Sequence, residues 1–247
     1  IGIVTDIQDV DNGPGNYGIR NNRSYADVVL HTGSGLDPVG ATTSLSAYTT
    51  LNGVPAFTNL RGYSSIQDLA VDENGTYQGP FQIYDISYSI WYYATSGDFY
   101  NRYLVSPYDA SQNTAGWAMG FNYSGQLFIG TQYHGAETTS ITLTANNWYN
   151  ICAVHSSDST VDVYINGVKE HTGSTSWGYN YSFDNISIGG RGIHSGSSGN
   201  YYDNVSGPIA SVAVYNKRLY ESEVESNYNR NCSKYGLPYL AAYNTSG

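Results

Sequence analysis

Aromatic side chains carry the clearest chemical signal in this sequence of 247 residues. Trp177, Tyr179 and Tyr181 alternate in SWGYNYSF, so their rings face the same way if the segment is extended. Tyr201 and Tyr202 form an aromatic pair in the Gly- and Ser-rich stretch that follows. Sugars stack their C–H faces on such rings, and nearby Asn and Asp side chains supply directional hydrogen bonds. These five residues predict a carbohydrate-binding surface, with packing against the sandwich or a neighbouring subunit as the equal alternative.

Loop oxygens suggest a second kind of site. Asp98 lies in SGDFYN, and Asp203 and Asn204 are adjacent in YYDN. Proteins bind Ca²⁺ through carboxylate and carbonyl oxygens, so these three residues are the candidate ligands of a calcium ion, the one cofactor that the sequence suggests. The alternative is an Asx-turn, which Asp and Asn form without a metal.

Few residues are suited to catalysis, and their spacing matches no known catalytic or zinc-binding pattern. Glycoside hydrolysis needs two carboxylates on opposite sides of a cleft, but the densest acidic cluster, Glu221, Glu223 and Glu225, falls in an expected helix with a solvated acidic face. The five histidines show neither zinc-motif nor triad spacing. The sequence therefore predicts that the chain is not an enzyme.

Composition narrows the range of partners and locations. Charged residues make up 12% of the chain and the formal net charge is −10, which excludes a nucleic-acid partner because phosphate binding needs a basic surface. No apolar run approaches the roughly 20 residues of a membrane span. The 26 Tyr and 28 Gly, with many Ser, Thr and Asn, suit twisted strands and tight turns and favour an extracellular or virion-surface location. Cys152 and Cys232 either pair or stay as buried thiols.

Short apolar or alternating runs separated by turn residues predict an all-β chain. In Val161 to Ile165 the apolar residues alternate with Asp162 and Tyr164, so one face is expected to be buried and the other to meet solvent or a ligand. Asn166-Gly167 then predicts a type I′ hairpin, and Tyr123-Ser124-Gly125 predicts a second turn between the strands expected at 117–121 and 126–129. The stretch 192–207 reads as a long loop, and the one short helix is expected near 220–228. The predicted strands are 88–93, 117–121, 126–129, 141–144, 149–155, 161–165, 186–188 and 209–215, with Trp91, Trp117 and Trp148 in the core.

One domain accounts for most of the chain. We predict an N-terminal arm or connector over residues 1–27, a sandwich over residues 28–237 and a C-terminal tail over residues 238–247.

Three segments of the sequence together resemble the laminin G-like jelly roll of the concanavalin A-like lectin/glucanase superfamily. They are NWYNICAVH followed by VDVYINGV, then ISIGGRG followed by GPIASVAVYNKRLYESEV, and GVPAF ahead of YSIWYY. The resemblance implies a two-sheet antiparallel jelly-roll sandwich with one short C-terminal helix. Two positions depart from the family pattern: Tyr220 replaces the Ser that caps the helix, and Ala210 replaces an Asp that serves calcium in many relatives. The Glu-x-Asp-x-x-Glu strand of endoglucanases is also missing from the sequence.

Three functions follow from these observations. The first is a non-catalytic structural protein of a virus or phage particle, such as a fibre, tail or capsid-decoration component, with glycan binding and with other virion or filament subunits as partners. The second is a secreted or cell-surface lectin-like adhesin that binds extracellular glycans. The third, a glycoside hydrolase, is the least favoured because the paired acids are missing.

Overall fold

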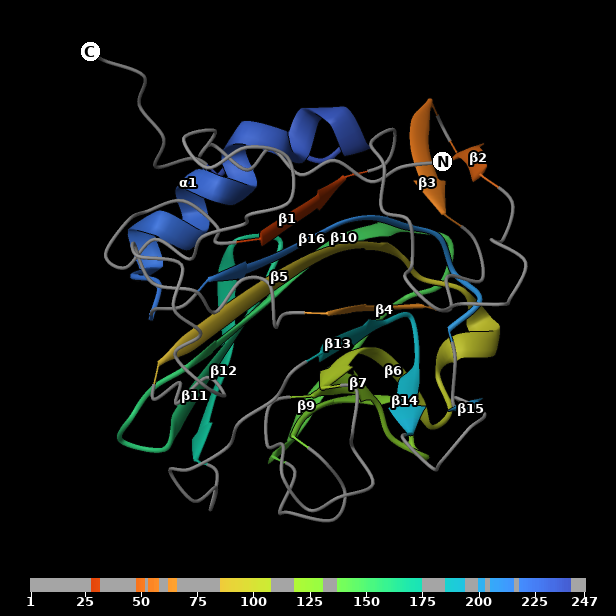
Figure 1. Ribbon diagram of the computed structural model, residues 1–247. Helices are drawn as coiled ribbons and strands as arrows, with labels where there is room; N and C mark the ends of the chain where they lie inside the picture. The colour runs from red at the N-terminus through yellow and green to blue at the C-terminus, as the bar shows by residue number, and fades with distance from the viewer. Residues whose placement is uncertain are drawn as a thin grey trace, which may run out of the picture.

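Two antiparallel sheets stacked face to face form the body of the protein (Figure 1). The described strands make an eight-stranded sheet, a six-stranded sheet and a two-stranded ribbon, and one helix follows near the C-terminus. The predicted all-β sandwich with one short C-terminal helix is therefore confirmed. The protein is seen here in a computed structural model, which describes residues 28–31, 48–51, 53–57, 62–65, 85–107, 118–130, 137–174, 185–193, 200–202, 205–215 and 218–240.

The larger sheet is built around β5 (Ile86–Tyr93), which pairs along its whole length with β10 (Trp148–His155). On its other side β5 pairs with β16 (Ile209–Tyr215), which also carries β1 (Val28–His31). The remaining members of this sheet are β11 (Thr160–Ile165) and β12 (Val168–Ser174) beyond β10, and β3 (Val54–Phe57) and β2 (Tyr48–Leu51) beyond β16.

The smaller sheet runs in the order β4 (Gly62–Ser65), β13 (Asn185–Ile188), β6 (Arg102–Pro107), β7 (Met119–Phe121), β8 (Gln126–Ile129) and β9 (Glu137–Thr142). The ribbon pairs β14 (Arg191–Ile193) with β15 (Asn200–Tyr202), so the long loop predicted over 192–207 contains strand residues at 192–193 and 200–202, while 194–199 and 203–204 lie outside the described residues. The residues around Gly192 and Tyr201 show no apolar alternation, so these strands could not be predicted from the sequence pattern.

Side chains that alternate along the strands fill the space between the sheets. In β5, Ile86, Tyr88, Ile90 and Tyr92 all point into this core, where they meet apolar residues of both sheets. Burying each such side chain contributes roughly 1.5–3 kcal/mol, so this core supplies most of the driving force for folding.

The second face of the larger sheet is also covered, by α1 (Glu221–Asn231) and the short 3-10 helix η3 (Cys232–Tyr235) (Figure 1). The ring of Tyr235 stacks on Trp91 with centroids 3.8 Å apart. Tyr164 is 2% exposed and Asp162 5% exposed, so the prediction that this face meets solvent or a ligand is wrong. The helix buries apolar residues that face away from the core, among them Trp91, Trp148, Cys152, Val154 and Tyr215.

The predicted burial of Trp91 and Trp148 is confirmed, and Trp117 lies outside the described residues. The helix runs three residues beyond its predicted end. Its first turn is capped from one side, because the Glu223 carboxylate accepts a hydrogen bond from the Tyr220 N–H at 2.9 Å while the Tyr220 side chain makes no cap bond. Beyond η3, Leu240 donates its N–H to Asn229 Oδ1 at 2.8 Å, so the first residues of the predicted tail pack on α1.

Both turns predicted from the sequence are confirmed. Asn166 and Gly167 have φ values of 53° and 78°, as a type I′ turn requires. Asn166 also accepts a hydrogen bond from the Asn150 N–H through Oδ1 at 2.9 Å, which ties the turn to β10. The second turn joins β7 to β8 at Gly125, where φ is 76°. Cys152 and Cys232 are both free and buried, which answers the question of their pairing.

A side-chain hydrogen bond joins the two sheets along one side of the sandwich. The Glu137 carboxylate on β9 lies 2.9 Å from His171 Nε2 on β12. Both strands end their sheets, so the contact bridges two edges. Gly173 makes room for it, because a Cβ at that position would collide with the Glu137 carboxylate.

His155, at the end of β10, makes folding sensitive to acid. Burial lowers the pKa of His155 to about 4, although the charges of Asp85 and Asp158 oppose the shift. The unfolded chain, in which the pKa is about 6.5, therefore binds a proton between those two values that the folded chain does not. Stability should be complete above pH 6.5 and fall as the pH drops toward 4, with this residue responsible for roughly 2–3 kcal/mol of the loss.

Urea unfolding of the parent protein and of His155→Gln at pH 7 and pH 4.5 tests this expectation. The variant should lose less stability between the two pH values than the parent. An equal loss in both proteins would show that His155 does not cause the acid sensitivity.

Candidate functional site

Two exposed tyrosines stand together at one end of the sandwich. Tyr100 and Tyr123 are each 58% exposed, and their rings meet edge to face with centroids 5.1 Å apart and planes at 77°. Tyr100 comes from the segment between the 3-10 helix η2 (Ser96–Asp98) and β6, and Tyr123 from the β7–β8 turn. We call this pair the tyrosine platform. Exposed apolar ring faces that hold each other in place are suited to stacking against a ligand.

The β7–β8 turn holds Tyr123 through its own hydrogen bonds. The Gly125 N–H donates to the Asn122 carbonyl at 3.1 Å, which closes the turn. Asn122 Oδ1 accepts from the Ser124 N–H at 2.8 Å and from the Gln126 N–H at 3.0 Å. Because the Asn122 side chain satisfies two backbone donors, the backbone that carries Tyr123 is fixed.

Contacts between the two loops hold Tyr100 against this turn. The Asn101 N–H donates to the Asn122 carbonyl at 3.2 Å, and Asn101 adopts a positive φ of 45°. Below the platform, the rings of Phe99 and Phe121 meet edge to face with centroids 5.2 Å apart. Neighbours of both tyrosines are thus joined to each other, so the two rings share one rigid support.

A buried carboxylate anchors the segment that leads to Tyr100. Asp98 is 1% exposed and accepts five hydrogen bonds. Its Oδ1 accepts from the Ser206 N–H at 2.7 Å and the Ser206 hydroxyl at 2.9 Å. Its Oδ2 accepts from the Tyr92 hydroxyl at 2.7 Å, the Thr95 hydroxyl at 2.7 Å and the Gly207 N–H at 2.6 Å. Charge-assisted bonds of this kind are about twice as strong as neutral ones, so Asp98 binds the 95–98 segment firmly to the 206–207 segment.

The pKa of Tyr92 reflects the same cluster. Burial raises the pKa of its hydroxyl well above the ordinary value, and the charge of Asp98 raises it further. Tyr92 therefore keeps its proton and acts as a donor to Asp98 throughout the neutral and basic range.

Two of the sequence-predicted aromatic residues lie on a described strand. Tyr201 and Tyr202 belong to β15, and Tyr202 is four residues before Ser206, which bonds Asp98. An extended chain spans at most about 3.5 Å per residue, so Tyr202 lies within roughly 14 Å of Ser206 along the backbone. Trp177, Tyr179, Tyr181, Asp203 and Asn204 lie outside the described residues, so the glycan and calcium roles assigned to them stay predictions.

Asp98 as a calcium ligand also stays a prediction, although its carboxylate is already surrounded by five hydrogen-bond donors. In the part of the chain that the structure describes, no group of three or more His, Cys, Asp and Glu side chains is placed to hold a metal ion. The described helices include none long and apolar enough to cross a membrane.

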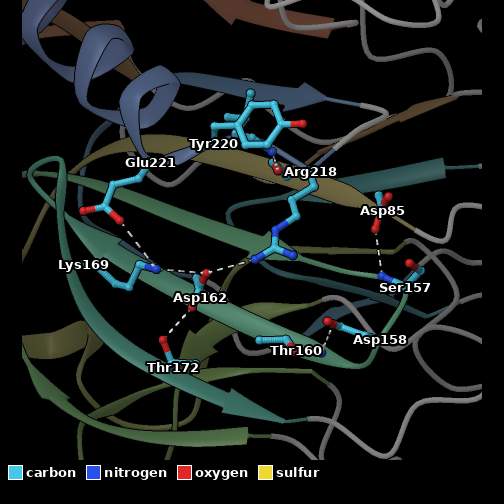
Figure 2. A network of polar contacts seen from close by, with 12 residues as sticks. Asp85, Ser157, Asp158, Thr160, Asp162, Lys169, Thr172, Arg218, Tyr220 and Glu221 are labelled. Atoms are coloured by element: carbon cyan, nitrogen blue, oxygen red, sulfur yellow. Dashed lines mark hydrogen bonds and ion pairs between the residues drawn. The ribbon is translucent and has the colours of Figure 1, made fainter.

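A second polar cluster lies on the outer face of the larger sheet, beside the start of α1 (Figure 2). The Asp162 carboxylate lies 3.3 Å from Lys169 Nζ and 3.7 Å from Arg218 Nη2, and it accepts a hydrogen bond from the Thr172 hydroxyl at 2.5 Å. Lys169 also lies 3.7 Å from Glu221. Partial burial lowers the pKa of Lys169, but the hydrogen bond and charge of Asp162 outweigh it and raise the pKa.

These contacts give the Asp162 cluster a structural role. They join β11, β12 and the chain just before α1, as the dashed lines in Figure 2 show. The expectation that Glu221, Glu223 and Glu225 lie on the helix is confirmed. Glu221 pairs with Lys169, and Glu223 caps the helix.

The family of the chain follows from its sequence together with this fold. The family model described as the concanavalin A-like lectin/glucanases superfamily matches residues 68–225, which is more than half of the chain. The chain belongs to this superfamily. A comparison with curated proteins finds no match. The resemblance drawn from the three sequence segments is thereby confirmed at the level of the superfamily.

Solved structures with the same fold include sialidases. A Trypanosoma rangeli sialidase in complex with sialic acid is similar with a TM-score of 0.50 and 16% identity, over 74% of this chain and 28% of that chain. A mutant of that sialidase displaying trans-sialidase activity gives a TM-score of 0.51 and 14% identity, over 73% and 28%. A heptameric SAP-like pentraxin from Limulus polyphemus gives a TM-score of 0.43 and 19% identity, over 57% and 68%.

These neighbours correct one prediction. The inference that the chain is not an enzyme is contradicted, because the chain belongs to a superfamily of lectins and glucanases and shares its fold with parts of sialidases. The missing Glu-x-Asp-x-x-Glu strand excluded one catalytic arrangement and not glycoside chemistry as a whole. The chain spans 28% of the length of the first of these sialidases, and at this identity the likeness establishes the fold alone.

The tyrosine platform was not predicted from the sequence. Tyr100 and Tyr123 are 23 positions apart in the sequence, and neither lies in an alternating aromatic run: Tyr100 follows Phe99 in SGDFYN, and Tyr123 lies among polar residues in NYSGQ. The predicted turn at Tyr123-Ser124-Gly125 could have indicated part of the platform. A large aromatic side chain in a tight turn is exposed unless another element covers it.

Proposed function

We propose that this member of the concanavalin A-like superfamily binds glycans and that the tyrosine platform is the surface on which a sugar ring stacks. The observation that carries the proposal is the exposed, edge-to-face pair of Tyr100 and Tyr123 on a support fixed by Asp98 and Asn122. Tyrosine suits this task because its ring offers a large contact area at a small cost in side-chain entropy.

The groups around the platform add the polar part of a sugar site. Both phenol hydroxyls are available for hydrogen bonds at the rim, and Ser124 lies exposed between Tyr123 and Gly125. Sugar sites combine such directional groups with an aromatic face. Tyr201 and Tyr202, together with Trp177, Tyr179 and Tyr181, are proposed to extend the surface, as their sequence pattern predicts.

A glycan array followed by calorimetry on the best ligand tests the platform. The double variant Tyr100→Ala with Tyr123→Ala should weaken glycan binding roughly 10- to 100-fold, because two stacking faces are lost. Its unfolding midpoint should hardly change, since both rings are largely exposed.

The control uses two other exposed tyrosines, Tyr220 at 70% and Tyr239 at 62% exposure. The double variant Tyr220→Ala with Tyr239→Ala removes the same atoms away from the platform and should bind like the parent. Equal binding by the platform variant and the parent would overturn the site, and a parent protein that binds no glycan would overturn the function.

The biological setting is proposed from the amino-acid composition alone. The acidic, Tyr- and Gly-rich composition supports a place outside the cell, either on a secreted or cell-surface adhesin or on a virus or phage particle among other virion subunits. Mass spectrometry of purified particles and of culture supernatant from the source would separate these settings.

A further inference from the structure

Arg102, which has no carboxylate within salt-bridge distance among the described residues, belongs to the segment that carries Tyr100. Arg102 is the first residue of β6, two positions after Tyr100, and it pairs across the sheet with Phe121, two positions before Tyr123. Its side chain is half-buried. Nη1 donates one hydrogen bond, to the Asn101 carbonyl at 3.2 Å. A guanidinium carries five N–H groups, so most of its donor capacity remains for another partner.

Several other basic side chains of the described residues face a carboxylate, although the exposed Arg230 and Lys234 do not. Lys169 and Arg218 both face the Asp162 carboxylate, and His171 faces Glu137. In the described part of the chain, no carboxylate lies within salt-bridge distance of Arg102. A chain with 20 acidic and 10 basic residues has carboxylates to spare, so a half-buried guanidinium without one is notable.

The two loops that carry the platform contain no exposed acidic side chain to offset the charge of Arg102. Within the two loops, residues 95–102 and 121–126, the one acidic residue is Asp98. It is 1% exposed and both of its oxygens accept hydrogen bonds from neutral donors. Arg102 is therefore the one charged side chain of these two loops that is not fully buried, although the chain as a whole is strongly negative.

We infer that the tyrosine platform selects acidic glycans, with Arg102 as the group that receives a carboxylate or sulfate on the sugar next to the stacked ring. This inference rests on the proposed glycan binding. The planar guanidinium presents two parallel N–H groups that match the oxygens of a carboxylate or a sulfate ester, and a partly buried setting strengthens the contact. The negative field of the rest of the protein would repel such a ligand elsewhere, so Arg102 also sets where it binds.

Matched glycan pairs test the inference. Oligogalacturonates are compared with their methyl esters, which keep the backbone and lose the charge, and a sulfated galactan is compared with its desulfated form. The parent protein should bind at least one acidic member about tenfold more tightly than its neutral partner. The pair that shows the difference identifies the anionic group as carboxylate or sulfate.

Variants assign the preference to its residue. Arg102→Gln should bring the ratio of acidic to neutral affinity from about ten to about one, and Arg102→Lys should keep part of the preference. Tyr100→Ala with Tyr123→Ala should instead weaken both members of the pair. In the unaltered protein, rising salt should weaken the acidic ligand and spare the neutral one, a measurement that does not depend on how well a variant folds.

The outcomes separate this inference from the proposed function. Equal affinity of the parent for acidic and neutral partners, or an acidic preference that survives in Arg102→Gln, overturns the role of Arg102 while leaving glycan binding intact. Binding to no glycan of any class overturns both.

Discussion

Asp98→Ala is expected to lower the free energy of unfolding by roughly 3–5 kcal/mol, because it deletes the acceptor of five hydrogen bonds in a buried position. The Tyr92 hydroxyl and the Gly207 N–H would be left buried with nothing to accept their protons. Each orphaned donor costs about 1–3 kcal/mol, more than the bond itself contributes. Urea unfolding followed by tryptophan fluorescence measures the loss.

Asp158→Ala is the matched control for this substitution. Asp158 also accepts a hydrogen bond from a backbone N–H, that of Thr160 at 2.9 Å, but its carboxylate is exposed to water that can replace the contact. The unfolding midpoint of the control should stay close to that of the parent. A destabilisation of the same size in both variants would mean that the buried hydrogen bonds of Asp98 contribute no more to stability than the exposed one of Asp158.

Asp98→Asn separates shape from charge in the same cluster. The amide keeps the volume of the carboxylate but offers one acceptor oxygen in place of two, and its NH₂ group faces donors. We expect a loss of stability between those of the parent and Asp98→Ala. Because Asp98 anchors the segment that leads to Tyr100, glycan binding should weaken in both Asp98 variants and be unchanged in Asp158→Ala.

Gly167→Ala is the second substitution with a large expected effect, about 2–4 kcal/mol of lost stability. Gly167 has a φ of 78°, where a Cβ is strained by about 1–3 kcal/mol. The added Cβ would also lie 2.8 Å from Leu240 Cδ1 and 3.0 Å from Tyr228 Cβ, so the hairpin would push against α1 and the segment that follows η3.

Gly236→Ala isolates the backbone part of that cost. Gly236 has a φ of 70°, close to that of Gly167, but a Cβ there meets nothing within 4 Å. Thermal unfolding of the two variants should therefore show a smaller decrease for Gly236→Ala. If the two decreases were equal, the clash of the added Cβ with Tyr228 and Leu240 would contribute nothing to the loss of stability in Gly167→Ala.

The strands of the core were predictable because their pattern is local. Val161 and Val163 alternate with polar or amphipathic neighbours, and the Asn-Gly dipeptide marks the following turn without reference to the rest of the chain. The burial of the second face was missed, although NICAVH carries apolar Cys152 and Val154 on the side opposite Ile151 and Ala153. A nearly continuous apolar run of this kind is typical of a strand covered on both faces.

The candidate site was less predictable because it depends on contacts between distant segments. Asp98 was singled out as a loop carboxylate, but only the fold brings Ser206 and Gly207 to it, 108 and 109 positions along the chain. In the sequence, a carboxylate that accepts bonds from a distant backbone cannot be told from one that binds a metal ion. The tyrosine platform arises in the same way, from two loops that meet through the Asn101–Asn122 hydrogen bond.

The Glu137–His171 pair lies at the exposed strand edges through which copies of this protein could associate. Every open sandwich has sides where an outermost strand leaves N–H and C=O groups unpaired, and another molecule can add a strand there. Here both outermost strands on one side carry inward-turned ionisable side chains that hold each other, and β12 also displays the charged Lys169 and Glu170. An approaching strand would have to desolvate those charges, so this flank is expected to resist the strand-by-strand growth that leads to aggregates.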